Sequence, residues 1–270
     1  MNMISLQKPG CIMKTKITHR LLAAMLSLAL ITALLPMASF AADGVSYIDA
    51  NGQTQTVDNV TEITAGTATL SDGWYVVSGN VTRGSGSSDR ITVNATGDGA
   101  HLILADGCDY TVNGGIQVQV SNKLTIYAQS AGASMGKLTV QNVADNSAGI
   151  GGDNNNAGGA ITINGGKVTT VGGSAGAGIG GGMGGNITIT GGMVTATGGQ
   201  YSAGIGGGFG GTSGVIIISG GEVTATGGGG DYGGAGIGTG RYYTYKDSDD
   251  SSITISGGEV TATGSKGGAG

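Results

Sequence analysis

The sequence predicts an all-β chain folded as a parallel β-helix, or β-solenoid, and three observations support this. A Gly-rich unit of the form Ile-Thr-Ile-x-Gly-Gly-x-Val-Thr recurs with small variations, and its copies begin at Ile161, Ile187, Val215 and Ile253. A second phrase, Ala-Gly-Ile-Gly, lies between these copies and is centred on Ile150, Ile179, Ile205 and Ile237. Ile, Val and Thr dominate both phrases and alternate apolar with polar residues, as in strands with one buried face.

The repeat period fits one coil of such a solenoid. The step is 26 residues from Gly165 to Gly191, 29 from there to Gly220, and 37 from there to Gly257. Repeats in this range bury their apolar side only by stacking on neighbouring repeats. We therefore expect equivalent isoleucines to form internal ladders about 4.8 Å apart, with glycines turning the chain between the faces.

Composition excludes one alternative and weakens another. The chain has 59 glycines in 270 residues but only 2 prolines, and it has no Gly-X-Y phase, which excludes collagen. The glycines lie between regular segments of β-branched residues, which argues against disorder. An irregular β-sandwich or a partly disordered array remain as competing interpretations.

The N-terminus predicts secretion. Three basic residues precede an apolar run over 21–35, and a small-residue pattern ends at Ala41, so residues 1–41 are interpreted as a signal peptide. The run is short for a membrane span, so we expect no membrane insertion after cleavage, with a retained signal anchor as the alternative. Met13 begins a more typical signal than Met1 does. The predicted location is extracellular, with attachment to a cell wall as one version of it.

Charge narrows the range of partners. The chain has 12 Lys and Arg against 17 Asp and Glu, and removal of residues 1–41 leaves a formal charge of −9. Such a surface repels nucleic acid and anionic lipid, so neither is expected as a partner.

The processed chain divides into three parts. Residues 42–60 contain an Asn51-Gly52 turn between alternating segments and are predicted to form a hairpin that caps the solenoid. Residues 61–145 are interpreted as degenerate coils and residues 146–270 as regular repeats. The sequence ends inside another copy of the repeat, which leads us to expect further domains downstream of Gly270.

These residues resemble a known family. Ser71-Asp-Gly-Trp-Tyr-Val-Val, His101-Leu-Ile-Leu-Ala-Asp-Gly-Cys and Lys123-Leu-Thr-Ile-Tyr are similar to the N-terminal section of Gly-rich repeat surface proteins of anaerobic Gram-positive bacteria. Those proteins continue into the same two repeated phrases. The resemblance covers nearly all of the chain after residue 41. It implies a right-handed parallel β-helix with a carbohydrate-binding or adhesin-like role, and it implies no catalytic residue.

An enzyme is the main competing interpretation, because many β-helix proteins cleave acidic polysaccharides. A glycosidase needs two opposed carboxylates, and Glu222 and Glu259 occupy equivalent positions that should share one face. Lys167 and Met193 stand at that position in the other copies, which favours a solvated strand position. We therefore assign no catalytic residue and predict a non-catalytic protein, with a lyase or glycosidase, or a purely structural stalk, as alternatives.

Three isolated residues are interpreted as structural. His101 is the only histidine after residue 41, so a histidine pair cannot form, and it opens an apolar segment. Cys108 has no cysteine partner in the processed chain and is expected in the core. Trp74 is expected to pack against the cap.

The best candidate binding site is the insertion that lengthens the last repeat. It is rich in tyrosines, which suit stacking on sugar C–H faces. The expected carbohydrate-binding residues are Arg241, Tyr242, Tyr243, Tyr245 and Asp247, with Tyr201 and Tyr232 extending an aromatic track. The alternative is an exposed loop whose tyrosines pack on the coil beneath.

The same insertion carries the only suggestion of a metal. Asp247, Asp249 and Asp250 are residue types that bind Ca²⁺, which is the one cofactor the sequence suggests. A solvated charge run is the ordinary interpretation of such a loop. The Gly-Gly-x-Gly-x-Asp motif of calcium-binding solenoids does not occur.

Overall fold

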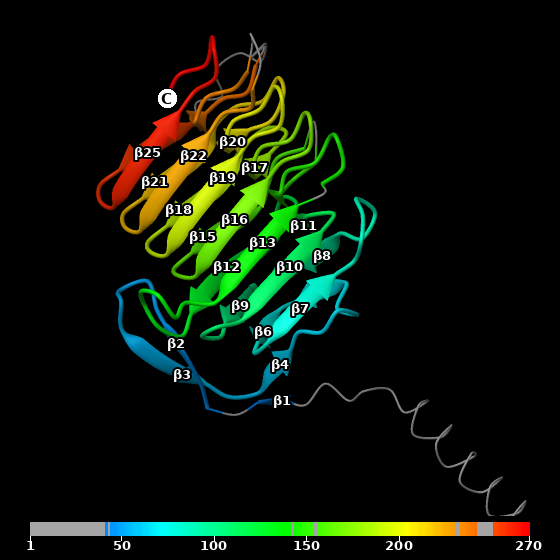
Figure 1. Cartoon of the computed structure of the whole chain (residues 1–270), viewed down its shortest axis with the longest axis vertical. Coiled ribbons are helices and arrows are strands. Elements are labelled where there is room, and N and C mark those ends of the chain that lie inside the picture. The colour runs from blue at the N-terminus through cyan, green and yellow to red at the C-terminus, as the bar shows by residue number, and fades with distance from the viewer. Residues whose placement is uncertain (1–40, 43, 142, 154–155, 230–232, 242–250) are drawn as a thin grey trace, which may run out of the picture. The chain divides into compact units, whose positions relative to one another are not determined.

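The computed structural model confirms the predicted fold class. It describes residues 41–42, 44–141, 143–153, 156–229, 233–241 and 251–270. Within these ranges the chain forms strands and turns without any helix, and the strands build three parallel sheets and one antiparallel hairpin (Figure 1). The predicted signal peptide, apart from Ala41, lies outside the described residues.

Three sheets form the faces of the solenoid, and from β6 onward the successive strands belong to sheets 1, 2 and 3 in turn. Sheet 1 contains β1 (Ala41–Ala42), β4 (Val60–Glu62), β6 (Gly73–Val77), β9 (Ala100–Leu104), β12 (Lys123–Ala128), β15 (Ala160–Ile163), β18 (Gly185–Ile189), β21 (Gly214–Ile218) and β24 (Ser252–Ile255). Sheet 2 contains β7 (Asn80–Arg83), β10 (Asp109–Asn113), β13 (Lys137–Gln141), β16 (Lys167–Val171), β19 (Met193–Thr197), β22 (Glu222–Thr226) and β25 (Glu259–Thr263). Sheet 3 contains β5 (Thr69–Ser71), β8 (Ile91–Asn94), β11 (Ile116–Gln117), β14 (Ile150–Gly151), β17 (Ile179–Gly181), β20 (Ile205–Gly207) and β23 (Ile237–Gly238).

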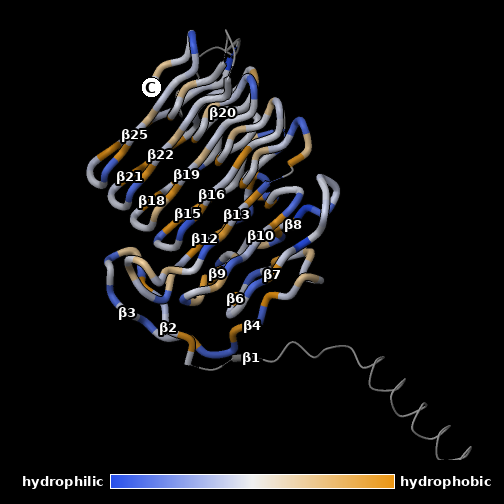
Figure 2. The backbone as a smooth tube through the Cα atoms, in the orientation of Figure 1, coloured by the Kyte–Doolittle hydropathy of each residue, from blue (hydrophilic) through white to orange (hydrophobic). Residues whose placement is uncertain are grey.

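The predicted ladders of apolar residues are present in all three sheets. In sheet 1, Ile161, Ile187 and Ile216 pair in register, and all three are buried. In sheet 3, Ile179 and Ile205 pair in the same way. Figure 2 shows hydrophobic and hydrophilic residues alternating along the strands of sheet 2, so each strand sends one set of side chains inward and the other outward. Continuous burial of these ladders supplies the main stabilising term of the fold.

Glycines in sheet 3 allow the coils to stack closely. Gly151, Gly180 and Gly206 follow the ladder isoleucines and have φ values of +138°, +140° and +128°. A Cβ atom at any of them would overlap the carbonyl oxygen of the equivalent glycine in the next coil. The second glycine of the Ala-Gly-Ile-Gly phrase is therefore a steric requirement of this face in the regular repeats, because L side chains rarely adopt this conformation.

The degenerate coils contribute β10 to sheet 2 and β11 to sheet 3. The alternating segment at 115–120 forms only the short strand β11, and its Val120 side chain is 66% exposed. Strand β10 follows the turn at Asp106 and Gly107 and pairs in register with β7 and β13. Cys108 lies buried beside that turn, as predicted, and burial raises the pKa of its thiol.

The N-terminal hairpin consists of β2 (Val45–Ile48) and β3 (Thr54–Val57), joined by a turn at residues 49–53. It packs on the outer surface of sheet 1, where its Tyr47 ring contacts Trp74 and Tyr127 at centroid distances of 4.7 and 4.8 Å. Strand β4, near the start of that sheet, pairs with β1. The prediction that Trp74 packs against the hairpin is confirmed.

Candidate functional site

The described part of the predicted site centres on Tyr201, in the turn between β19 and β20. The Tyr201 ring meets the Phe209 ring edge-on at a centroid distance of 5.5 Å. The Arg241 guanidinium carbon lies 5.4 Å from the centre of the Tyr201 ring, within range of a cation–π interaction. Tyr201 and Arg241, which the sequence predicted together, are thus in contact.

Backbone hydrogen bonds fix these residues across successive coils. The Arg241 amide donates to the Tyr201 carbonyl at 2.7 Å, and the Gly210 amide donates to the Arg241 carbonyl at 2.7 Å. Toward the preceding coil, the Phe209 amide donates to the Ala175 carbonyl at 3.0 Å. Because the main chain holds both aromatic residues, their rings project from a rigid edge of the solenoid.

A hollow of about 420 Å³ opens beside the two rings. Its lining residues are Asp145, Asn146, Ser174, Ala175, Tyr201 and Phe209, which we name the Tyr201 groove. Asn146, Ala175 and Tyr201 each lie four residues before a sheet 3 isoleucine, so equivalent turns of three successive coils form the groove. The Ala175 amide donates to the Asp145 carbonyl at 2.6 Å, which holds the first two of these turns together.

The chemistry of the Tyr201 groove is mixed. Phe209 is 38% exposed, and it supplies an apolar ring next to the phenol of Tyr201. Asp145 supplies a carboxylate and Asn146 an amide, both on exposed residues, and Ser174 adds a hydroxyl. Aromatic surface beside a few hydrogen-bonding groups is the usual composition of a small-ligand site.

A family model described as Beta helix repeat matches residues 161–183, 187–209, 216–241 and 253–270. These four stretches of the regular array are therefore similar to beta helix repeats. Each match begins in a strand of sheet 1, and the first three continue through sheet 3 into the loop that follows it. No curated protein and no solved structure matches the chain. Tyr201 and Phe209 lie in the second matched repeat, and Arg241 ends the third.

Of the six residues that line the groove, the sequence predicted only Tyr201, and Phe209 and Asp145 show why the others were missed. Phe209 occupies the position that Met183 has in the preceding beta helix repeat, four residues after the ladder isoleucine. Aligning the repeats could have shown that the aromatic residue is specific to one coil. Asp145 lies just before the matched array, in a turn whose place beside Tyr201 depends on the stacking of coils.

The other predicted site residues cannot be placed. Those that lie outside the described residues are Tyr232, Tyr242, Tyr243, Tyr245, Asp247, Asp249 and Asp250. Across the described residues, no three His, Cys, Asp or Glu side chains gather closely enough to hold a metal ion. In the same ranges no helix is long and apolar enough to span a membrane.

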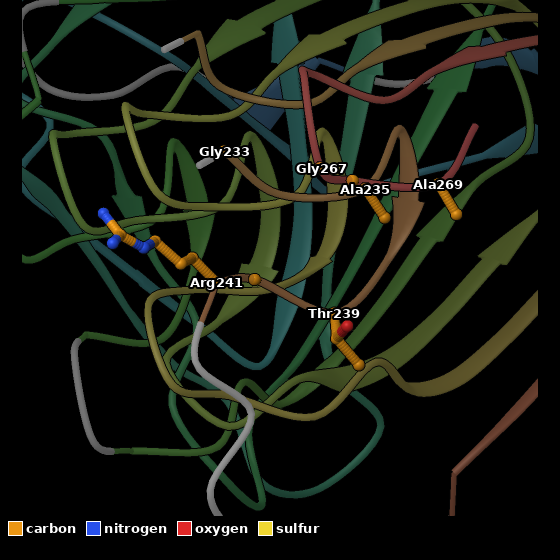
Figure 3. Close-up of a pocket in the computed structure, with 8 residues that line it drawn as sticks. Gly233, Ala235, Thr239, Arg241, Gly267 and Ala269 are labelled. Carbon is orange, nitrogen blue, oxygen red and sulfur yellow. The ribbon is translucent and has the colours of Figure 1, made fainter. Parts of the chain in front are cut away.

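A second hollow, of about 260 Å³, lies at the C-terminal coil (Figure 3). It is lined by Gly233, Ala235, Thr239, Gly240, Arg241, Gly267, Gly268 and Ala269. Figure 3 shows the Arg241 side chain extending away from Ala235 and Ala269. Apart from that arginine, the lining offers backbone, methyl groups and one hydroxyl, so it brings together no chemically reactive set.

A partly buried ion pair joins three coils on the outer side of sheet 3. The Arg90 guanidinium donates to the Asp153 carboxylate and to the Ser147 hydroxyl, and Gln117 donates to the same carboxylate at 2.6 Å. Burial works to raise the pKa of Asp153, but the hydrogen bonds and charge of Arg90, aided by Ser147 and Gln117, lower it overall. This carboxylate is thus held ionised as part of the scaffold.

His101 belongs to the aromatic cluster under the hairpin. Its ring stacks on Trp74 at a centroid distance of 4.3 Å, and its Nδ1 lies 3.0 Å from the Tyr127 hydroxyl. Burial lowers the pKa of His101, although the charges of Asp98 and Asp72 oppose this shift. The prediction of a structural role is consistent with this packing.

Proposed function

We propose that this chain is a secreted, surface-displayed β-helix that binds carbohydrate without catalysis, and that the Tyr201 groove takes part in binding. The observation that carries the proposal is the pair of half-buried Tyr201 and exposed Phe209 beside the carboxylate of Asp145 and the amide of Asn146. Sugar rings present apolar C–H faces that stack on aromatic rings, while their hydroxyls exchange hydrogen bonds with carboxylates and amides.

The scaffold supports the same role. The groove is built from turns of stacked coils, and its rings are held through backbone hydrogen bonds. A binding surface on a rigid element loses little conformational freedom on association. The N-terminal pattern supports the extracellular location, where glycans of cell walls and host surfaces are the polymers available to such a protein.

A glycan array followed by affinity measurement on the retained sugars tests the proposal. Tyr201→Ala and Phe209→Ala should each weaken binding about tenfold or more, which corresponds to about 1.4 kcal/mol lost at an aromatic contact. Tyr201→Phe should retain stacking and lose only what the hydroxyl contributes.

Ile217→Ala is the matched control. Ile217 is 39% exposed, close to the exposure of Phe209, but it lies on sheet 1, away from the groove. Its replacement should leave affinity unchanged. Absence of glycan retention, or equal losses in the groove variants and in this control, would reject the Tyr201 groove as a sugar site. A structural stalk would then be the better account.

A further inference from the structure

The outer face of sheet 2 carries three rows of side chains that run along the solenoid. The first residues of its strands form one row in continuous register, which we name the charged row: Asn80, Asp109, Lys137, Lys167, Met193, Glu222 and Glu259. Two residues further along each strand lies the threonine row: Thr82, Thr111, Thr139, Thr169, Thr195, Thr224 and Thr261. Neutral hydroxyls thus cover the centre of the face, and its charges lie along one side.

The charged row is arranged symmetrically about Met193. Lys167 lies one strand before it and Glu222 one strand after it. Lys137 lies two strands before it and Glu259 two strands after it. Reversing the direction of the row therefore exchanges each lysine with a glutamate. A surface with this property is electrostatically complementary to a second copy of itself.

The face is available to a partner. Met193 is 39% exposed, and Val171, in the third row with Thr197, Thr226 and Thr263, is 43% exposed. No side-chain hydrogen bond found in the described residues involves the threonine row, in which the Thr139 hydroxyl is buried. The hairpin packs on sheet 1 instead. Sheet 2 is the sheet whose strands β7 to β25 cross the front of the molecule in Figure 1.

Existing contacts leave the lysine charges free to act on a partner. The Lys137 ammonium lies 3.3 Å from the Asp109 carboxylate, in a pair whose side chains are each 47% exposed. The Lys167 ammonium donates to the neutral Ala133 carbonyl at 2.8 Å. Exposed ion pairs are weak, so Lys137 can also interact with a carboxylate on a facing molecule.

We propose that two copies of this chain associate through sheet 2, face to face, about a two-fold axis parallel to β19. This operation keeps the strand direction and reverses the solenoid direction. Lys167 of each copy then faces Glu222 of the other, and Lys137 faces Glu259, while the two Met193 side chains meet at the axis. The threonine rows face each other, at the roughly 10 Å separation of stacked sheets. The inference is independent of the sugar site.

The size of the patch sets the expected strength. Five strands about 4.8 Å apart and about five residues of about 3.3 Å give an overlap of about 24 Å by about 17 Å. That is smaller than the roughly 800 Å² per partner of a typical stable complex. The dimer should therefore be weak, with a dissociation constant above about 1 μM, and sensitive to salt because its charges are exposed.

Charge reversal tests the arrangement by sedimentation velocity in low salt. The double variants K137E/K167E and E222K/E259K should each dimerise at least about tenfold more weakly, because each places like charges opposite one another. An equimolar mixture of the two should form a heterodimer, since one now presents four glutamates and the other four lysines. The fourfold exchange of all these charges should restore the homodimer.

The matched control for K137E/K167E is the double variant K123E/K266E, which changes the net charge of the chain by the same amount. Lys123 begins a strand of sheet 1, and Lys266 lies after the last strand of sheet 2. Its dimerisation should fall much less than that of K137E/K167E. The proposal is overturned if the unaltered protein stays monomeric up to about 1 mM, if the mixture gives no heterodimer, or if the control weakens association equally.

Discussion

The two halves of the solenoid stabilise the same coil in different ways. In the degenerate coils, side chains hold the turns: Asp72 accepts hydrogen bonds from the amides of Gly97 and Gly99, and the Asn122 side chain accepts one from Ala95. In the regular repeats, backbone hydrogen bonds hold many of the turns, and glycines lie there directly against the backbone of neighbouring coils. The first half thus depends on specific polar side chains, and the second on the absence of side chains.

The largest effect is expected from adding a side chain to the glycine ladder. Gly180→Ala places a methyl group against the Gly206 carbonyl, at a φ of +140° that alanine avoids. The steric overlap and the unfavourable backbone conformation act together at a buried position, so we expect a loss of about 4 kcal/mol or more in the free energy of unfolding. Urea denaturation followed by circular dichroism measures it.

Gly79→Ala is the control for this prediction. Gly79 lies in the degenerate half, an added Cβ there meets no atom within 4 Å, and its φ is not positive. Its replacement should change stability by no more than about 0.5 kcal/mol. Similar losses in the two variants would show that the glycine ladder has no special steric role.

A smaller effect is expected from removing a polar side chain in the degenerate half. Asp72→Ala leaves the Gly97 and Gly99 amides without their acceptor, which lies 2.9 and 2.8 Å away in the intact protein. Since the residue is exposed and water can replace part of the loss, we expect about 1–2 kcal/mol less stability in the same denaturation assay.

Asp98→Ala is the control for Asp72→Ala. Asp98 is an exposed residue between Gly97 and Gly99, and its carboxylate does not accept the hydrogen bonds that the amides of these glycines donate to Asp72. It should cost less than about 0.5 kcal/mol. Equal losses from the two aspartates would indicate that net charge matters here and that the hydrogen bonds do not.

The same contrast explains what the sequence could predict. The repeat period and the alternation of Ile, Val and Thr predict the strands of the regular array, because every copy has the same local pattern of apolar and polar residues. They also place Glu222 and Glu259 on one face, as the register confirms. In the degenerate half, β10 and the short β11 follow from packing against neighbouring coils, which no local pattern encodes.

The candidate site was predicted only where one coil departs from the repeat. Tyr201 and Arg241 were found because aromatic and basic residues are rare in this array. Asp145 and Phe209 were missed because their proximity is created by stacking three turns. The symmetry of the charged row about Met193 was missed for the same reason, since it appears only after the strands are aligned in register.

The smallest predicted effect concerns the hairpin interface and its response to pH. Burial lowers the pKa of His101 from its usual 6.5, so the unfolded chain binds a proton more readily than the folded chain does. The stabilising contribution of neutral His101 is therefore complete above about pH 6.5. It declines as the pH falls from there through the lowered pKa, because protonation then favours unfolding. Thermal unfolding between about pH 7.5 and pH 5 should show this decline in the unaltered protein.

His101→Phe keeps a ring that can stack on Trp74 but cannot take a proton. The variant should show a shallower decline over the same range, with a difference of about 1 kcal/mol or less, because the ring is only half buried and the nearby Asp98 and Asp72 favour the charged form. The Tyr47 contact with Trp74 ties the hairpin to the same cluster. Tryptophan fluorescence, which reports on Trp74 alone in this chain, should therefore change along with the unfolding curve. Parallel pH curves for the two proteins would show that the acid sensitivity over this range does not come from His101.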